Sequence, residues 1–470
     1  MPGICHEIFM GSCHGAIPLA SQTGQTARTN HNGAGCMRQW FTLIGYRFVT
    51  WSLALLLRLH LQRRVWDGKE DAERVQERLG NPTHMRPRGK LVWFHAASVG
   101  ESMSAMPLLE AILAKSDCQV LMTTGTVTSA QLMSKRLPPR TFHQYIPLDH
   151  PIWVRRFLNY WKPDFAVFIE GELWPNLLSA LRSRRVPAVL VNASLSNQSS
   201  RRWAFARSLL KRILNSFELV LAATKEDEVR FQRLGITHTE AVGHLKFATP
   251  PLDVDTAELA KLRAAIGNRP VWLAASTHKG EEEMVVALHQ QLAPRLPGLL
   301  TIIAPRHPAR ANDIKGLWAR YDLSHALRSS GKMPTADDDI YVVDTLGDMG
   351  LFYSLAPVTF LGGSMVPVGG HNIVEAMQLQ SALVVGPHME SLRDIAPRMI
   401  SKGALLQVPN AEELTAVVQK LLTDEDLRNQ QIAAATHALI SEAKTLPNIL
   451  AAMTPALERA EIWKRQQLAA

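Results

Sequence analysis

Beyond residue 90, short apolar runs alternate with amphipathic stretches, and this alternation constrains the fold more than any other feature. It is typical of βαβ units, in which helices join parallel strands. The pattern occurs twice, so we predict an α/β chain with two doubly wound, Rossmann-like sheets. The candidate strands are 91–97, 119–124, 165–169, 188–192 and 219–223, then 271–275, 300–304, 340–344, 358–361 and 382–385.

The two halves are separated by residues that interrupt regular structure. Two adjacent prolines, Pro250 and Pro251, precede a polar helix, and a Gly/Asn/Pro turn at 267–270 follows it. Such turns are typical of a hinge, and 470 residues suit two domains. The predicted division is 1–36 as a disordered or non-native extension, 37–66 as a membrane-anchoring helix, 67–248 as an N-terminal Rossmann-like domain, 249–270 as a linker, and 271–470 as a C-terminal Rossmann-like domain.

Composition narrows the class of protein. A hydrophobic content of 46% argues against disorder, and a mean hydropathy of −0.04 excludes a polytopic membrane protein. Basic residues exceed acidic ones by nine, which favours an anionic partner such as nucleic acid, anionic lipid or a phosphorylated substrate. Cys118 has no predicted disulfide partner, so a reducing compartment fits best.

Residues 1–36 lack a periodic apolar pattern and the basic flank of a secretory signal. Cys5, His6, Cys13 and His14 suggest a zinc site, but no second, properly spaced pair follows. We therefore expect a disordered tail, or an extension upstream of a start at Met37, and no metal.

The segment 37–66 is rich in aromatic and leucine residues and contains no acidic residue. Arg47 and Arg58 are eleven positions apart, which places them on nearly one helical face. This pattern is typical of a helix lying in a membrane surface. A tilted span and a helix packed on the protein's own core remain alternatives. Basic flanking residues predict that the bulk of the chain is cytoplasmic, at the inner membrane.

The densest motif runs from Leu361 to Ala376. A strand leads into two glycine pairs, after which Asn372 can cap a helix that carries Glu375 in its first turn. Glycines let a ligand approach the backbone, and a helix N-terminus attracts phosphate. Glu375 is therefore a candidate acceptor for ribose hydroxyl groups, although it could merely favour the helix dipole.

Three further motifs follow strands of the second half. Arg306 can hold a phosphate or a sugar carboxylate in fork geometry. Asp348, in Leu346-Gly347-Asp348, could contact the same nucleotide or cap the next helix. Ser276 to Gly280 precedes three glutamates and is consistent with anion binding.

In the first half, Glu101 follows a strand and a glycine, where a carboxylate could take a proton from an alcohol. A helix-dipole role is equally consistent with its spacing. Glu170 and Glu172 compete for the role of base, although Trp174-Pro175-Asn176 suggests that they hold a turn or the acceptor. Patterns of hydrolases and NTPases are absent from the sequence.

Eight basic residues and no acidic one lie between Leu181 and Phe217. Few aromatic residues are interleaved with them, which disfavours nucleic acid and leaves a phosphorylated lipid as the preferred partner. The basic residues are Arg182, Arg184, Arg185, Arg201, Arg202, Arg207, Lys211 and Arg212.

From Met37 onward the sequence resembles the bacterial 3-deoxy-D-manno-octulosonic acid (Kdo) transferases of lipopolysaccharide assembly. The segments that carry the resemblance are His95–Glu101, Glu172–Asn176, Pro305–Pro308 and Gly362–Glu375. Residues 192–198 depart from the family pattern, which is richer in Arg and Glu, and residues 1–36 have no counterpart.

The resemblance implies a GT-B fold and an inverting glycosyltransferase that uses CMP-Kdo as donor. It makes 67–248 the acceptor domain and 271–470 the CMP-sugar-binding domain. The acceptor would be a hydroxyl of a phosphorylated lipid A precursor, with no metal or cofactor on the enzyme. Glu101 matches the family's catalytic base. The residues that match the family's CMP contacts are Pro305, Arg306, Leu346, Gly347, Asp348, Asn372, Ile373, Val374 and Glu375.

Two other functions remain open from the sequence. A related lipid-linked enzyme that uses a UDP-sugar would share the fold and the apolar helix. A non-enzymatic membrane or nucleic-acid-binding protein would explain the charge but not the strand-end motifs. The number of Kdo residues transferred is open too.

Overall fold

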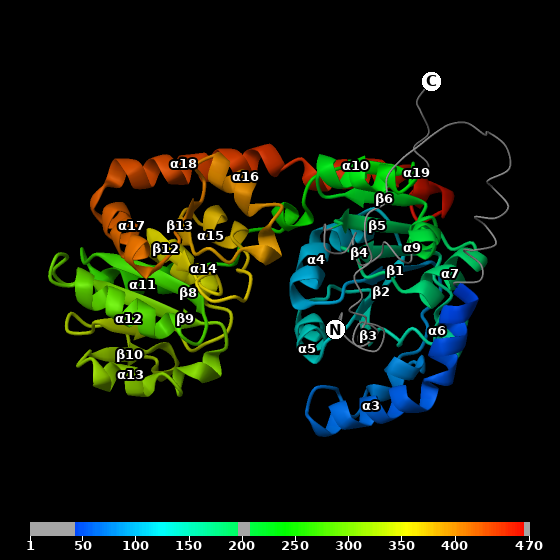
Figure 1. Ribbon diagram of the computed structural model, residues 1–470, viewed down its shortest axis with the longest axis horizontal. Coiled ribbons are helices and arrows are strands. Elements are labelled where there is room, and N and C mark those ends of the chain that lie inside the picture. The colour runs from blue at the N-terminus through cyan, green and yellow to red at the C-terminus, as the bar shows by residue number, and fades with distance from the viewer. Residues whose placement is uncertain (1–42, 196–206, 465–470) are drawn as a thin grey trace, which may run out of the picture. The chain divides into compact units, whose positions relative to one another are not determined.

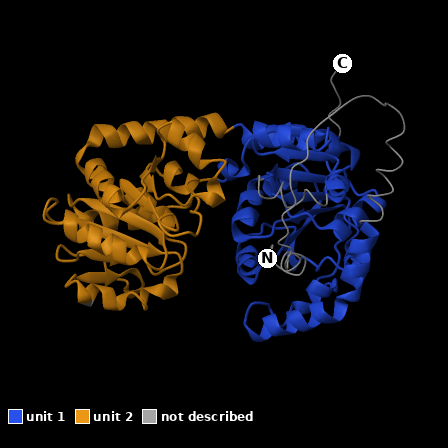
Figure 2. Ribbon diagram, viewed as in Figure 1, with its two compact units in different colours: residues 1–249, 444–470 blue, residues 250–443 orange. Residues whose placement is uncertain are grey.

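The chain divides into two compact units, residues 1–249 with 444–470, and residues 250–443 (Figure 2). A computed structural model describes residues 43–195 and 207–464 (Figure 1). The predictions for the extension 1–36, with its candidate zinc ligands, and for Arg201 and Arg202 lie outside these ranges.

The first unit contains a sheet of seven parallel strands with the 3-2-1-4-5-6-7 order of a Rossmann-like fold. Side chains alternate between its two faces, so Trp93 packs on one side and Val92 and Phe94 pack on the other. In spatial order the strands are β3 (Thr141–Tyr145), β2 (Gln119–Thr124), β1 (Leu91–His95), β4 (Phe165–Ile169), β5 (Ala188–Ala193), β6 (Leu219–Ala222) and β7 (Thr239–Ala241). The helices are α3 (Ala54–Trp66), η1 (Val75–Leu79), α4 (Val99–Ala114), α5 (Val127–Arg136), α6 (Pro151–Trp161), α7 (Pro175–Ser183), α9 (Arg207–Leu214), α10 (Lys225–Arg233), η2 (Leu245–Ala248) and α19 (Thr445–Arg459).

The second unit also has seven parallel strands, with β8 and β9 at its centre. In spatial order they are β10 (His325–Leu327), β11 (Ile340–Val342), β9 (Leu300–Pro305), β8 (Val271–Thr277), β12 (Val358–Leu361), β13 (Ala382–Val385) and β14 (Leu406–Gln407). The helices are α11 (Thr256–Ile266), α12 (Glu281–Leu292), η3 (Pro308–Ala311), α13 (Lys315–Arg320), η4 (Arg328–Ser330), α14 (Met349–Leu355), α15 (Val374–Gln378), η5 (Glu390–Leu392), α16 (Ala396–Ser401), α17 (Ala411–Thr423) and α18 (Glu425–Glu442).

The C-terminal segment corrects one predicted boundary. The sequence placed all of 271–470 in the second domain, but residues 444–470 belong to the first unit. Ile449, Met453 and Leu457 of α19 are fully buried in the same hydrophobic cluster as Val92 and Phe94 of β1. The helix covers one face of the first sheet. Local sequence pattern could not predict this contact, because α19 and β1 are far apart in the sequence. The predicted linker 249–270 contains α11, which belongs to the second unit.

The apolar segment is helical over residues 43–52 and again through α3, with one face packed on the first unit. Leu43, Thr50, Leu57 and Leu61 form the buried face. The exposed face carries a row of large apolar side chains. Packing on the core therefore explains the apolar residues of the buried face but not those of the exposed face. None of the helices within 43–195 and 207–464 is long and apolar enough to cross a membrane. We call the exposed row the apolar stripe; its members are Ile44, Phe48, Trp51, Leu55 and Leu59.

Candidate active site

Glu101 lies where β1 turns into α4, at the carboxyl edge of the first sheet. The Ser98 side chain caps α4 by accepting a hydrogen bond from the Glu101 amide at 3.3 Å. The Glu101 carboxylate folds back onto the same turn, where Oε2 accepts the Ala97 amide at 2.8 Å and Oε1 accepts the Ser98 hydroxyl at 3.0 Å. The loop therefore fixes the orientation of the carboxylate.

Burial, together with the negative charges of Glu170 and Glu172, raises the pKa of Glu101 to about 7. The Ala97 and Ser98 hydrogen bonds act in the opposite direction, because they stabilise the ionised form. A carboxylate with a pKa near neutrality is suited to accept a proton in catalysis, which a simple helix-dipole role does not require.

The two competing carboxylates are engaged by other side chains. Glu172 Oε2 lies 3.2 Å from His95 Nε2 and accepts the Trp174 indole N–H at 3.1 Å. Glu170 accepts the Asn192 amide at 3.2 Å. Its backbone has a φ of 65°, a left-handed conformation that a non-glycine residue adopts at some cost. The interpretation that these two residues hold the turn after β4 agrees with these contacts.

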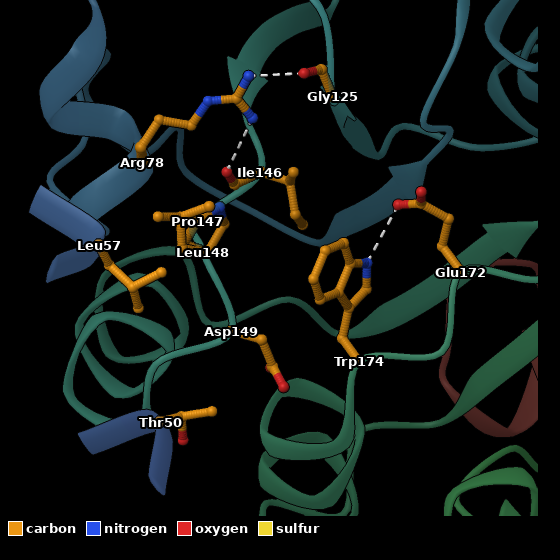
Figure 3. A pocket seen from close by; sticks show the side chains of 10 residues that line it. All are labelled: Thr50, Leu57, Arg78, Gly125, Ile146, Pro147, Leu148, Asp149, Glu172 and Trp174. Carbon is orange, nitrogen blue, oxygen red and sulfur yellow. Dashed lines mark hydrogen bonds between the residues drawn. The ribbon is translucent and has the colours of Figure 1, made fainter. Parts of the chain in front are cut away.

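A pocket in the first unit lies beside this turn (Figure 3). Thr50 and Leu57 of the N-terminal helical segment line it, together with Arg78, Glu172 and Trp174. Figure 3 shows the Trp174 ring directed between these residues, with its N–H on Glu172. The apolar segment and the carboxyl edge of the first sheet thus share one pocket.

At the carboxyl edge of the second sheet, Pro305 and Arg306 lie at the end of β9, and Asn372 to Glu375 come after β12. Arg306 is exposed directly after the buried Pro305. Burial raises the pKa of Glu375, and the Asn372 hydrogen bond and the charge of Arg306 partly oppose that rise. Asn372 donates to Glu375 Oε1 at 3.0 Å and accepts the Val374 amide at 3.2 Å. Ile373 and Val374 are buried in the core of the second unit.

The glycine-rich loop differs from the sequence prediction in one respect. Glu281, which is fully buried at the start of α12, accepts the backbone amides of Gly363 at 2.7 Å, Ser364 at 3.2 Å and Met365 at 2.9 Å. The Gly370 amide donates to the Gly363 carbonyl at 2.8 Å. These N–H groups are already satisfied within the protein, so they are not free to hold a phosphate.

Leu346, Gly347 and Asp348 follow β11, which adjoins β9 in the sheet. Leu346 is 85% exposed, and Gly347 has a φ of 99°. Asp348 accepts Arg328 Nε at 3.2 Å and the Thr345 hydroxyl at 2.6 Å. The Asp348 carboxylate is therefore paired. Asp348 precedes α14, but its side chain does not cap the helix.

The sequence did not predict a cluster of histidines beside Arg306. His278 and His371 stack with their Nε2 atoms 2.8 Å apart, and His307 lies next to His278. Burial, then the charge of Arg306, lowers the pKa of His371 to about 4. The sequence could have predicted this cluster, because residues that follow the neighbouring parallel strands β8, β9 and β12 lie at the same edge of the sheet. Among the residues that the structure describes, no group of three or more His, Cys, Asp or Glu is placed to hold a metal ion.

Two α/β units, each built on a parallel sheet with polar side chains at its carboxyl edge, resemble the GT-B fold. The chain is similar in fold to a UDP-N-acetylglucosamine 2-epimerase, with 14% identity, a TM-score of 0.55, and coverage of 82% of this chain and 98% of that one. This likeness concerns the fold alone.

Sequence comparisons define the family. Residues 73–249 match the family model of 3-deoxy-D-manno-octulosonic-acid transferase. The chain is 36% identical to the 3-deoxy-D-manno-octulosonic acid transferase of Rickettsia bellii, over 82% of this chain and 93% of that one. It is 30% identical to the transferase of the same name from Haemophilus influenzae, over 82% and 92%. The chain belongs to this family and is a glycosyltransferase, which disfavours the non-enzymatic alternative.

Proposed function

We propose that the protein transfers Kdo from CMP-Kdo to a hydroxyl of a phosphorylated lipid A precursor, in lipopolysaccharide biosynthesis. The observation that carries the chemistry is the half-buried Glu101 carboxylate, fixed by Ala97 and Ser98 and with its pKa raised to about 7. Glu101 removes the proton from the acceptor hydroxyl, whose oxygen attacks the anomeric carbon of Kdo with inversion.

The second unit binds the donor. Arg306 is the exposed cation at the end of β9, and it binds the phosphate that gathers charge as CMP leaves. Glu375, oriented by Asn372, accepts hydrogen bonds from the ribose hydroxyls. The complete set of donor contacts in this proposal is Pro305, Arg306, Leu346, Gly347, Asp348, Asn372, Ile373, Val374 and Glu375. The enzyme's own chemistry needs no metal or cofactor.

The apolar stripe lies in the cytoplasmic face of the inner membrane. Its residues recur every three or four positions on the face opposite the buried one, which suits a helix lying in the interface. The basic residues of α9, among them Lys211 and Arg212, favour an anionic lipid surface. This arrangement brings a lipid acceptor to the enzyme without a membrane span.

A transfer assay tests the proposal. Detergent-solubilised protein is given CMP-Kdo and radiolabelled lipid A precursor, and the lipid products are separated. A slower-migrating lipid is expected, and the number of bands counts the sugars added. Transfer from a UDP-sugar instead would overturn the proposed donor, and folded protein that does not bind CMP would contradict the proposed donor site.

A further inference from the structure

A buried arginine connects the N-terminal helical segment with the loop that holds Glu101. Arg78, in η1, is only 2% exposed, and Figure 3 shows its guanidinium directed to two backbone carbonyls. Its Nη2 atom donates to the Gly125 carbonyl at 2.6 Å and its Nη1 atom to the Ile146 carbonyl at 3.3 Å. These carbonyls follow β2 and β3, so one side chain joins two adjacent strand ends.

The same guanidinium is paired with a buried carboxylate. Arg78 Nε donates to Glu70 Oε2 at 3.1 Å, and Arg64 Nε of α3 donates to Glu70 Oε1 at 3.1 Å. Glu70 therefore joins the last turn of α3 to Arg78. Burial lowers the pKa of Arg78, and the charge of Glu70 opposes that effect. A buried ion pair with all of its groups bonded is rigid, and it is costly to leave half paired.

From Gly125 the contacts continue to the proposed base. The Gly125 amide donates to the Ala97 carbonyl at 3.0 Å, and the Ala97 amide donates to Glu101 Oε2 at 2.8 Å. The approach of the two loops is close, because a Cβ at Gly125 would lie 2.9 Å from the Ala97 oxygen. The Ala97 carbonyl that Gly125 contacts and the Ala97 N–H that bonds Glu101 lie on either side of one Cα, so displacing Gly125 should shift the residue that orients Glu101.

We infer that Arg78 is a positioning residue for the general base, acting through Gly125 and Ala97. The inference rests on the proposed role of Glu101. Arg78 keeps the Ala97 N–H on the Glu101 carboxylate. This hydrogen bond stabilises the ionised form of Glu101, which accepts the proton. Two charged groups act on Glu101, namely Glu170 and Glu172. Neither belongs to the hydrogen-bonded path from Arg78, and neither is changed in the test.

The test is the pH dependence of kcat for Arg78→Lys and Glu70→Gln, at saturating donor and acceptor. Lysine retains the charge opposite Glu70 but lacks the planar fork by which Arg78 reaches Glu70 and both carbonyls at once, and glutamine retains volume while weakening the pair. Loss of the Ala97 hydrogen bond favours protonated Glu101, so we expect the acid limb to move upward by about one pH unit. At pH 7 the rate then falls about fivefold and recovers at high pH, with KM unchanged.

Arg74→Lys is the matched control, because Arg74 lies in the same region but is bonded to Glu77 and His143 instead. Its acid limb should stay at the wild-type position. A uniform loss of rate or of thermal stability in Arg78→Lys and Glu70→Gln, with an unmoved limb, would overturn the positioning role. Glu70→Gln keeps the test decisive if Arg78→Lys fails to fold. A wild-type profile without a limb near pH 7 would instead remove Glu101 from the role of base.

Discussion

Glu281→Gln should loosen the glycine-rich loop, because one carboxylate satisfies four backbone amides. Oε2 accepts His278 at 2.9 Å and Gly363 at 2.7 Å, while Oε1 accepts Ser364 and Met365. A glutamine side chain replaces one acceptor oxygen with an NH2 group that is itself a donor. Two of the four amides then face a donor and lose their partner.

The magnitude follows from those two lost bonds. A hydrogen bond to a charged group contributes about 1.5–3 kcal/mol, so the loop should lose about 3–6 kcal/mol of its opening free energy. At about 1.4 kcal/mol per factor of ten, amide exchange in the loop should accelerate about 100-fold or more. Hydrogen exchange of peptides covering Gly363 to Met365, read by mass spectrometry on the full chain, measures this directly.

Glu283→Gln is the matched control in the same turn of α12. Glu283 accepts one backbone amide, that of Gly280 at 3.1 Å, and is not fully buried. Its replacement should change loop exchange by less than about tenfold. Equal exchange rates in wild type and Glu281→Gln would refute the reasoning, because they would mean that the carboxylate does not hold these amides.

Four other outcomes are expected. Because the pKa of Glu101 is about 7, only about 1% of this base is ionised at pH 5, and kcat should be about 50-fold lower there than at pH 7; a base of ordinary pKa would give less than about twofold, and a flat profile would contradict the assignment. Glu101→Gln should reduce transfer by about 10²–10⁴-fold while CMP-Kdo binding, measured by calorimetry, is retained. Arg306→Ala should weaken CMP-Kdo binding by at least about tenfold. Replacing Trp51 and Leu55 together by Gln should reduce flotation with anionic vesicles, whereas Met85→Gln, an exposed apolar position outside the apolar stripe, should not; equal flotation of all three proteins would exclude the stripe as a membrane contact.

Local pattern determined most of the fold. All ten predicted strands begin at the predicted residue. Buried parallel strands are continuous apolar runs, so they can be recognised from the sequence alone. The four strands that sequence analysis missed are β3, β7, β10 and β14. β3 reads Thr-Phe-His-Gln-Tyr, without an apolar run, and the others are two or three residues long at or near a sheet edge. Their pairing depends on the neighbouring strand rather than on their own composition.

The sequence by itself also located the candidate site residues, since polar side chains directly after apolar strands must lie at the carboxyl edge of a parallel sheet. Tertiary structure alone decided which of their groups are available. Glu281 occupies the amides of the glycine loop, α19 returns to the first sheet, and Arg78 reaches Gly125 across 47 positions of sequence. The physical reason is that backbone periodicity is a local property, whereas burial of a charge and the choice of its hydrogen-bond partner depend on segments that only folding brings together.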